Sequence, residues 1–189
     1  FRFTSITTER FCDFVEDHHP GLLARVDAEA WLNGTGMPAG APVARSGKLD
    51  ALAALAAGWG RGVRPDAAQM RAWSPTELQL FLQRLPRVLP CEDCAWLDAN
   101  LQLTARGNYE ILVEWLCIAA GSGYEPTFER VGQMLATVGR MKYVRPLYQA
   151  LGKTEAGRAL ARAVFAQASS SYHGLTRRVA EGVIAKYEA

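Results

Sequence analysis

The chain has 189 residues, which is the size of one somewhat large domain. Its 49% of hydrophobic and 21% of charged residues are ordinary globular values and exclude a disordered tail. The net charge of +2 is spread along the sequence without a basic block, and no apolar run approaches the roughly 18 to 20 residues that span a bilayer. We therefore expect neither a nucleic-acid partner nor a membrane partner.

The chain begins at Phe1 without an initiator Met and without signal-peptide character. We expect a C-terminal fragment of a longer multidomain polypeptide, folded as a single helical domain over residues 1–189. Four cysteines stand at irregular spacing: Cys12, Cys91, Cys94 and Cys117. This spacing is not the framework of a small secreted domain, so it favours a reducing compartment and a cytoplasmic location.

In the N-terminal part, short helices are separated by Gly and Pro. Thr8 is expected to cap a helix that runs to about Asp17, because apolar residues recur three and four positions apart there. Asp27 is expected to start a second short helix. Residues 33–47 carry four Gly and two Pro, which predicts an extended connector.

The clearest helix start is Ser74, which is followed by Pro75 and Glu77. Ser at the N-cap, Pro at the first position and Glu at the third form a capping box, in which Ser74 and Glu77 each satisfy a free backbone N–H. The apolar stripe that follows predicts a helix up to Pro86.

Most of the remaining sequence also has helical periodicity. Further helices are expected over residues 49–59, about 108–120, 126–138, about 143–151, from 154 onward and 175–187. No stretch has two-residue alternation bounded by hairpin turns, so we expect essentially no sheet. Short helices with one apolar face bury it best by stacking as antiparallel pairs. The prediction is an all-α fold, an irregular right-handed α-α superhelix of the armadillo or HEAT type, with about nine to eleven short helices.

Catalytic motifs are scarce. The three histidines form no His-Glu-x-x-His pair, so the helical zinc motif of metalloproteases is absent from this sequence. Cys91 and Cys94 form a lone C-x-x-C, which could be half of a zinc site or a redox pair. Without a second C-x-x-C or a βαβ pattern, we interpret them as two reduced cysteines at the start of a helix. We expect no catalytic residue, metal ligand or bound cofactor in this fragment.

One candidate binding segment remains. It comprises residues 139–147, with the sequence GRMKYVRPL. Gly139 suits the position after a helix end and Pro146 the first turn of the next helix, so Arg140 and Lys142 would lie in an interhelical turn. In a turn, residues two apart can face the same way. A guanidinium beside an ammonium group would then bind a carboxylate, although two solvated loop cations are the simpler alternative.

These residues resemble the signature near the C-terminus of the leukotriene A4 hydrolase and aminopeptidase B-like zinc metalloaminopeptidases. The resemblance covers nearly the whole chain in the family's order. It rests on residues 5–8, 31–38, 74–82, 108–115 and 139–148, and it is loose over residues 48–72. The sequence departs from the family at Gly174, where relatives have Pro, and in carrying the pair Cys91 and Cys94.

The resemblance implies that this chain is the C-terminal helical domain of a zinc-dependent aminopeptidase, a hydrolase whose zinc ligands and catalytic Glu lie upstream. It also implies that Arg140 projects into the active-site cleft and binds the free carboxylate of a small peptide substrate, assisted by Lys142. The implied partners are the upstream catalytic domain of the same chain and that peptide. The full-length protein would be the enzyme, while this fragment alone lacks the zinc motif.

Two alternatives stay open. The chain could be a helical-repeat module whose concave face binds a protein partner, with the signature kept for packing. It could also be part of a lipid epoxide hydrolase, in which Arg140 would bind a fatty-acid carboxylate.

Overall fold

The structure is a computed structural model, which describes residues 2–43 and 45–187. Within these ranges every regular element is helical: there are twelve α-helices and three short 3₁₀-helices. The predicted all-α fold class is confirmed. The chain divides into two compact units, Phe1–Ser46 and Gly47–Ala189, and the assignment of all residues to one domain stays a prediction. None of the described helices has the length and apolar character needed to cross a membrane.

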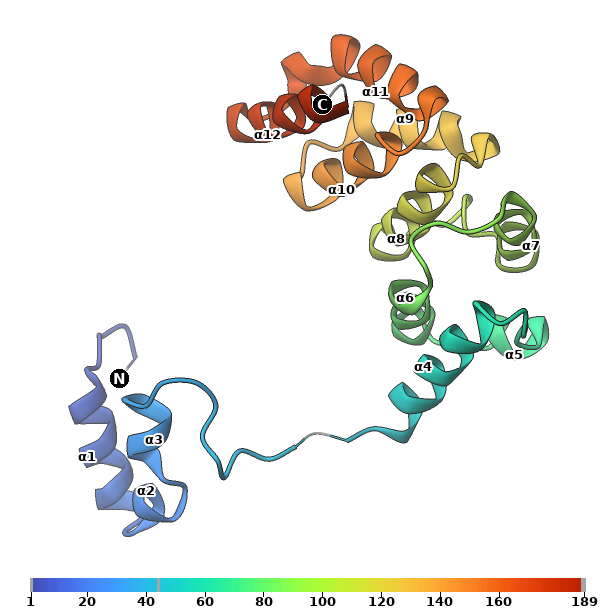
Figure 1. Cartoon of the computed structure of the whole chain (residues 1–189). Coiled ribbons are helices and arrows are strands. Elements are labelled where there is room, and N and C mark those ends of the chain that lie inside the picture. Colours follow the sequence, from blue (N-terminus) through green and yellow to red (C-terminus); the bar gives the residue numbers. More distant parts are fainter. Residues whose placement is uncertain (1, 44, 188–189) are drawn as a thin grey trace. The chain divides into compact units, whose positions relative to one another are not determined.

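The N-terminal unit contains three helices, α1 (Thr8–His18), α2 (Leu22–Arg25) and α3 (Ala28–Leu32), as Figure 1 shows. The cap of α1 is Thr7 rather than the predicted Thr8, and its side chain accepts from Arg10 N–H at 3.4 Å. Asp27 precedes α3 as predicted, but its backbone is left-handed with φ of 52° and its side chain makes no capping hydrogen bond. None of the described residues of this unit is buried.

The second unit contains the remaining elements. They are α4 (Gly47–Trp59), α5 (Ala67–Arg71), α6 (Pro75–Arg84), α7 (Cys91–Leu101), α8 (Tyr109–Gly121), η1 (Glu125–Thr127), α9 (Phe128–Thr137), α10 (Met141–Leu151), α11 (Glu155–Ala168), η2 (Ser169–Ser171), α12 (Gly174–Ile184) and η3 (Ala185–Tyr187). There are more helices than the expected nine to eleven because α2 and α5 have only four and five residues, too few to show periodicity.

The predicted capping box at the start of α6 is confirmed. Ser74 Oγ accepts from Glu77 N–H at 3.3 Å, and the Glu77 carboxylate accepts from Ser74 N–H at 2.9 Å. Hydrogen bonds from Ser74, first from its side chain and then from its backbone, lower the pKa of Glu77 to about 2. Asn108 and Thr154 cap α8 and α11 in the same way, accepting from backbone N–H groups.

The helices of this unit pack in two rows. α4, α6, α8, α10 and α12 pack in succession in one row, whereas α5 packs on α7 and α9 on α11 in the other (Figure 1). Two rows of short helices are the arrangement expected of a helical superhelix. Because α8 and α10 are neighbours in one row, their first turns lie close together.

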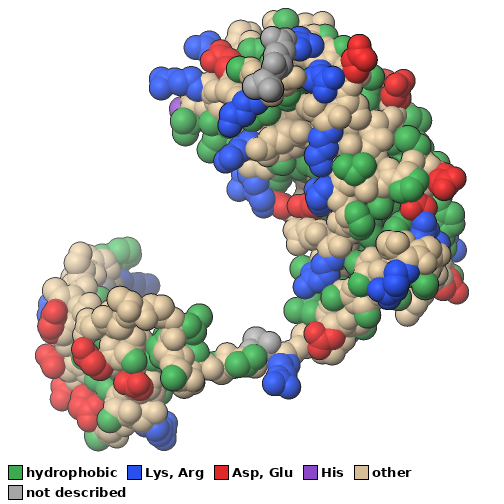
Figure 2. Space-filling model, in the orientation of Figure 1, with side chains coloured by type: hydrophobic (Ala, Val, Ile, Leu, Met, Phe, Trp, Pro, Cys, Tyr) green, Lys and Arg blue, Asp and Glu red, His purple; other side chains and the backbone are tan. Residues whose placement is uncertain are grey.

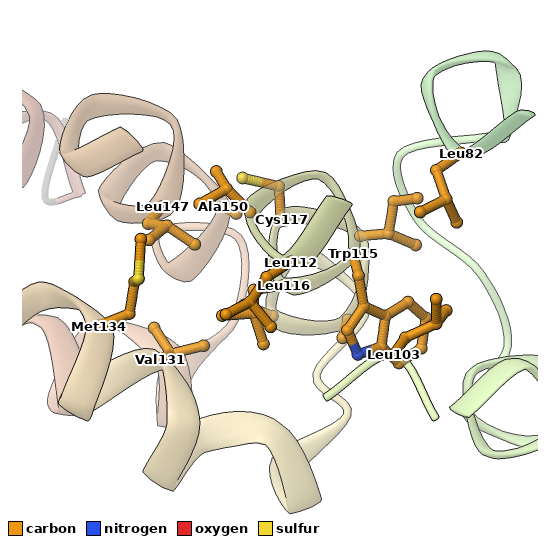
Figure 3. Packing of buried hydrophobic residues seen from close by; sticks show 14 of the residues in the cluster. Leu82, Leu103, Leu112, Trp115, Leu116, Cys117, Val131, Met134, Leu147 and Ala150 are labelled. Atoms are coloured by element: carbon orange, nitrogen blue, oxygen red, sulfur yellow. The ribbon is translucent and has the colours of Figure 1, made fainter. Parts of the chain in front are cut away.

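The core is centred on α8, whose residues from Ile111 to Gly121 are all buried except Glu114. Figure 3 shows its side chains between Leu82 on one side and Leu147 and Met134 on the other. The indole of Trp115 is fully buried and donates to Thr104 Oγ1 at 2.9 Å. A helix that is apolar all round is stable only when it is enclosed, so the other helices pack around α8.

The start of α10 differs from the prediction in two ways. The helix begins at Met141, so Lys142 lies in its first turn and not in the preceding loop, and Pro146 lies inside the helix. Gly139 does follow the end of α9 as predicted, although its φ is not left-handed. The helix continues through Pro146 because buried side chains, including Tyr143 and Leu147, recur at helical spacing on both sides of it.

Candidate functional site

The candidate site lies where the first turn of α10 meets the first turn of α8. Arg140 is the N-cap of α10, with an extended backbone at φ −72° and ψ 117°, and Lys142 is the second residue of the helix. Both side chains are exposed. The structure therefore places the two predicted residues at one helix start, on either side of the boundary between loop and helix.

Lys142 is paired with an acidic residue of α8. Its Nζ lies 2.6 Å from Glu110 Oε1 and 2.7 Å from Glu110 Oε2. Tyr143 O–H donates to the same carboxylate, at 2.8 Å from Oε1. These hydrogen bonds, from Lys142 first and then from Tyr143, lower the pKa of Glu110, and the charges of Lys142 and Arg140 lower it further. The charge of Lys142 is thus largely compensated within the chain.

Arg140 differs from Lys142 in its ion pairing. Among residues 2–43 and 45–187, no carboxylate forms an ion pair with its guanidinium. The guanidinium carbon lies 5.5 Å from the centroid of the Tyr143 ring, a distance at which a cation and an aromatic face attract each other. Its forked N–H donors therefore remain available to a planar anion.

Tyr143 holds the site together. The residue is 8% exposed, and its ring packs edge-on against Tyr109 with centroids 6.3 Å apart. Lys142 Nζ lies 5.7 Å from the centroid of the same ring. Sequence reasoning assigned no role to Tyr143, and it missed Glu110 because Glu110 is 32 residues from Lys142 in the chain. Only the packing of α8 on α10 brings them together.

The start of α10 is also suited to an anion. Arg140 as N-cap offers no side-chain acceptor to the first backbone N–H groups of the helix. Those groups form the positive end of the helix dipole. A carboxylate at this position would be stabilised both by the guanidinium and by the helix terminus.

The two cysteines of the C-x-x-C differ in burial. The two residues do begin a helix, α7, with Cys91 exposed and Cys94 buried. Burial raises the pKa of the Cys94 thiol to about 11 and that of Cys117 to about 12. Thiols with such pKa values are protonated at neutral pH and are poor nucleophiles.

One of the two acidic residues between these cysteines has a buried contact that sequence reasoning missed. Asp93 is buried, and it accepts from Trp59 Nε1 at 3.0 Å and from the Arg64 guanidinium. The guanidinium carbon of Arg64 lies 4.1 Å from the centroid of the Trp59 ring. Asp93 thus joins α7 to the end of α4. Across the described part of the chain, no group of three or more His, Cys, Asp or Glu residues is placed to hold a metal ion.

A model of the family described as leukotriene A4 hydrolase, C-terminal, matches residues 73–184, which include both Arg140 and Lys142. The chain belongs to this family. The resemblance inferred from residues 139–147 and the segments before them is therefore confirmed.

Curated relatives match along almost the whole chain. Leucine aminopeptidase 2-2 of Scheffersomyces stipitis is 29% identical over 94% of this chain and 31% of its own length. Aminopeptidase B of Mus musculus is 29% identical over 92% of this chain and 29% of its own length. Leukotriene A-4 hydrolase of Xenopus laevis is 26% identical over 93% of this chain and 30% of its own length. The chain thus spans about a third of the length of these relatives.

A solved structure shows the same fold. Native leukotriene A4 hydrolase from Saccharomyces cerevisiae aligns with a TM-score of 0.79 at 23% identity, covering 96% of this chain and 33% of that protein. At this identity the likeness supports the helical fold and no more.

Proposed function

We propose that this chain is the C-terminal domain of a zinc-dependent aminopeptidase, in which it closes the active-site cleft and binds the substrate's carboxylate. The family match and the names of the relatives support the proposal. The described residues do not fit a zinc site. The metal would be held by the upstream catalytic domain, and this chain would contribute binding and orientation. A cytoplasmic location belongs to the same proposal.

The observation that carries the proposal is the difference between Arg140 and Lys142. Arg140 has no carboxylate partner among the described residues, whereas Lys142 is bound to Glu110. We assign the direct contact with the carboxylate of a small peptide to Arg140, through two parallel N–H donors. Lys142 assists by holding Glu110, which would otherwise be drawn to Arg140 and compete with the substrate.

A peptide held at its C-terminal carboxylate would have its reacting end fixed relative to the catalytic groups. Binding energy from that remote contact can be used to orient the scissile bond. Loss of Arg140 is therefore expected to lower kcat as well as raise KM.

The test is kcat/KM of the full-length protein on a tripeptide and on its C-terminal amide. Arg140→Ala is expected to lower kcat/KM roughly ten- to a hundredfold on the free acid, because one charged hydrogen-bonding contact is lost, and to change it little on the amide. Arg84→Ala is the matched control, since Arg84 is another exposed arginine of the same helical row. Equal losses on acid and amide, or no loss on either, would overturn the assignment.

A further inference from the structure

A second cationic site lies between α10 and α12, away from the first turn of α10. It is a cavity of about 600 Å³. Four of the residues that line it are cations: Arg145, Lys153, Arg178 and Lys186. Among the residues that the structure describes, 2–43 and 45–187, no Asp or Glu lines it. Figure 2 shows Lys and Arg side chains gathered over this part of the second unit.

This concentration of charge is local. The whole chain carries a net charge of only +2, and yet four cations share one cavity. Within the described ranges no carboxylate forms an ion pair with any of the four. Lys153 lines the cavity with its stem, because its Nζ donates to the backbone carbonyl of Arg87 at 3.4 Å and lies beside Gly121 of α8. Like charges held together repel, so a bound anion would relieve the repulsion.

A glycine of α12, Gly182, lines the cavity between two of its cationic residues. Arg178, Gly182 and Lys186 follow one another at intervals of four residues, so they lie on the same side of α12 and its continuation. A Cβ at Gly182 would meet no atom within 4 Å, and its φ is not left-handed. Neither packing nor backbone conformation therefore requires glycine inside this helix, where alanine would be more stable. Gly182 is therefore a position at which a side chain can be added to the cavity wall without disturbing the packing.

One end of the cavity is fixed by Tyr187. A Cβ at Gly152 would collide with the Tyr187 ring, so the ring packs directly on the backbone of Gly152. Tyr187 O–H donates to the carbonyl of Tyr148. Together with Val179 and Val183, this ring gives the cavity an apolar wall beside its charged one.

We propose that this cavity binds a small anion with two adjacent phosphate groups. The guanidinium forks of Arg145 and Arg178 and the ammonium group of Lys186 offer more positive charge than a single carboxylate can use, and guanidinium forks match phosphate oxygens. The apolar wall would accept an organic group esterified to the diphosphate. The site is separate from Arg140, and its test does not depend on peptidase activity.

Calorimetric titration of the full-length protein tests this, with inorganic pyrophosphate, ADP and inorganic phosphate as probes. Pyrophosphate is expected to bind at least tenfold tighter than phosphate. Tighter binding of ADP than of pyrophosphate would identify a diphosphate ester as the ligand, whereas equal binding would identify free diphosphate. Lack of millimolar binding by both diphosphates would overturn the proposal, as would equal affinities for pyrophosphate and phosphate.

Substitutions at Gly182 test whether pyrophosphate binds in this cavity. Gly182→Glu places a carboxylate between the cations and is expected to weaken pyrophosphate binding at least tenfold. Gly182→Ala is the matched control, because its Cβ enters open space; it should leave binding unchanged and raise Tm. Arg178→Ala should also weaken binding severalfold, and it provides a second test if Gly182→Glu does not fold. Unchanged affinity in both variants would overturn the assignment of the cavity.

Discussion

The two units of the chain are both helical, but they bury their side chains very differently. In the N-terminal unit, Trp31 and Phe11 are each 48% exposed and none of the described residues is buried. In the second unit, the α8 residues Trp115 and Leu116 are fully buried. Caps and periodicity are present in both units, so local sequence is sufficient to define helices. Stability, by contrast, depends on the apolar surface that those helices enclose.

The largest expected effect follows from separating the units. A polypeptide of residues 47–189 is expected to keep its helical content and unfold in one cooperative transition. A peptide of residues 1–46 is expected to be largely unfolded in water, because helices of 11 residues or fewer are marginal without packing. Far-UV circular dichroism with thermal melting measures both. A cooperative melt of the short peptide would contradict this account.

A matched pair of tryptophan substitutions tests the difference in burial between the two units. Trp115→Ala is expected to lower the free energy of unfolding by about 3 to 5 kcal/mol, since it leaves a cavity in the core. Trp31→Ala removes a half-exposed ring and should leave the main transition within about 1 kcal/mol of the wild type. Urea unfolding of the full chain followed by circular dichroism compares the two. Similar losses would mean that Trp31 belongs to the same cooperative core as Trp115.

The sequence predicted the features whose parts lie within one helical turn of each other. The capping box was recognisable because Ser74, Pro75 and Glu77 are neighbours, and their chemistry does not depend on the rest of the fold. The all-α class was equally accessible, because each longer helix carries its own apolar stripe.

Features that depend on packing were not accessible from the sequence. Glu110 reaches Lys142 only because α8 lies against α10, and no spacing rule connects residues 32 positions apart. The start of α10 was placed too late because Pro146 was given the weight of a helix start. Burial of Tyr143 and Leu147 outweighs the loss of one backbone hydrogen bond at that proline.

The smallest expected effect is a difference in pH dependence between the first turns of α1 and α6. Glu77 has a pKa lowered to about 2 by Ser74, and the pKa of Glu9 is also lowered, first by a backbone hydrogen bond and then by Thr7. A carboxyl whose folded pKa is depressed stabilises the fold fully above its unfolded value of about 4.3, and this stabilisation is lost as pH falls through the folded pKa. The contribution of Glu77 should therefore decrease progressively below about pH 4.3 and be nearly lost at about pH 2.

NMR titration of the two carboxyl groups measures this difference between the units. Glu77 is expected to titrate near pH 2 in the wild type and to return toward its ordinary value in Ser74→Ala, where the hydroxyl donor is lost. Thr7→Ala should move the pKa of Glu9 upward by less, because the Thr7 side chain is only the second cause of the shift at Glu9, whereas the Ser74 side chain is the largest cause at Glu77. If Glu77 titrates at its ordinary value in the wild type, the capping box does not persist in solution. The two helix starts would then be equally weak, and burial alone would account for the greater stability of the second unit.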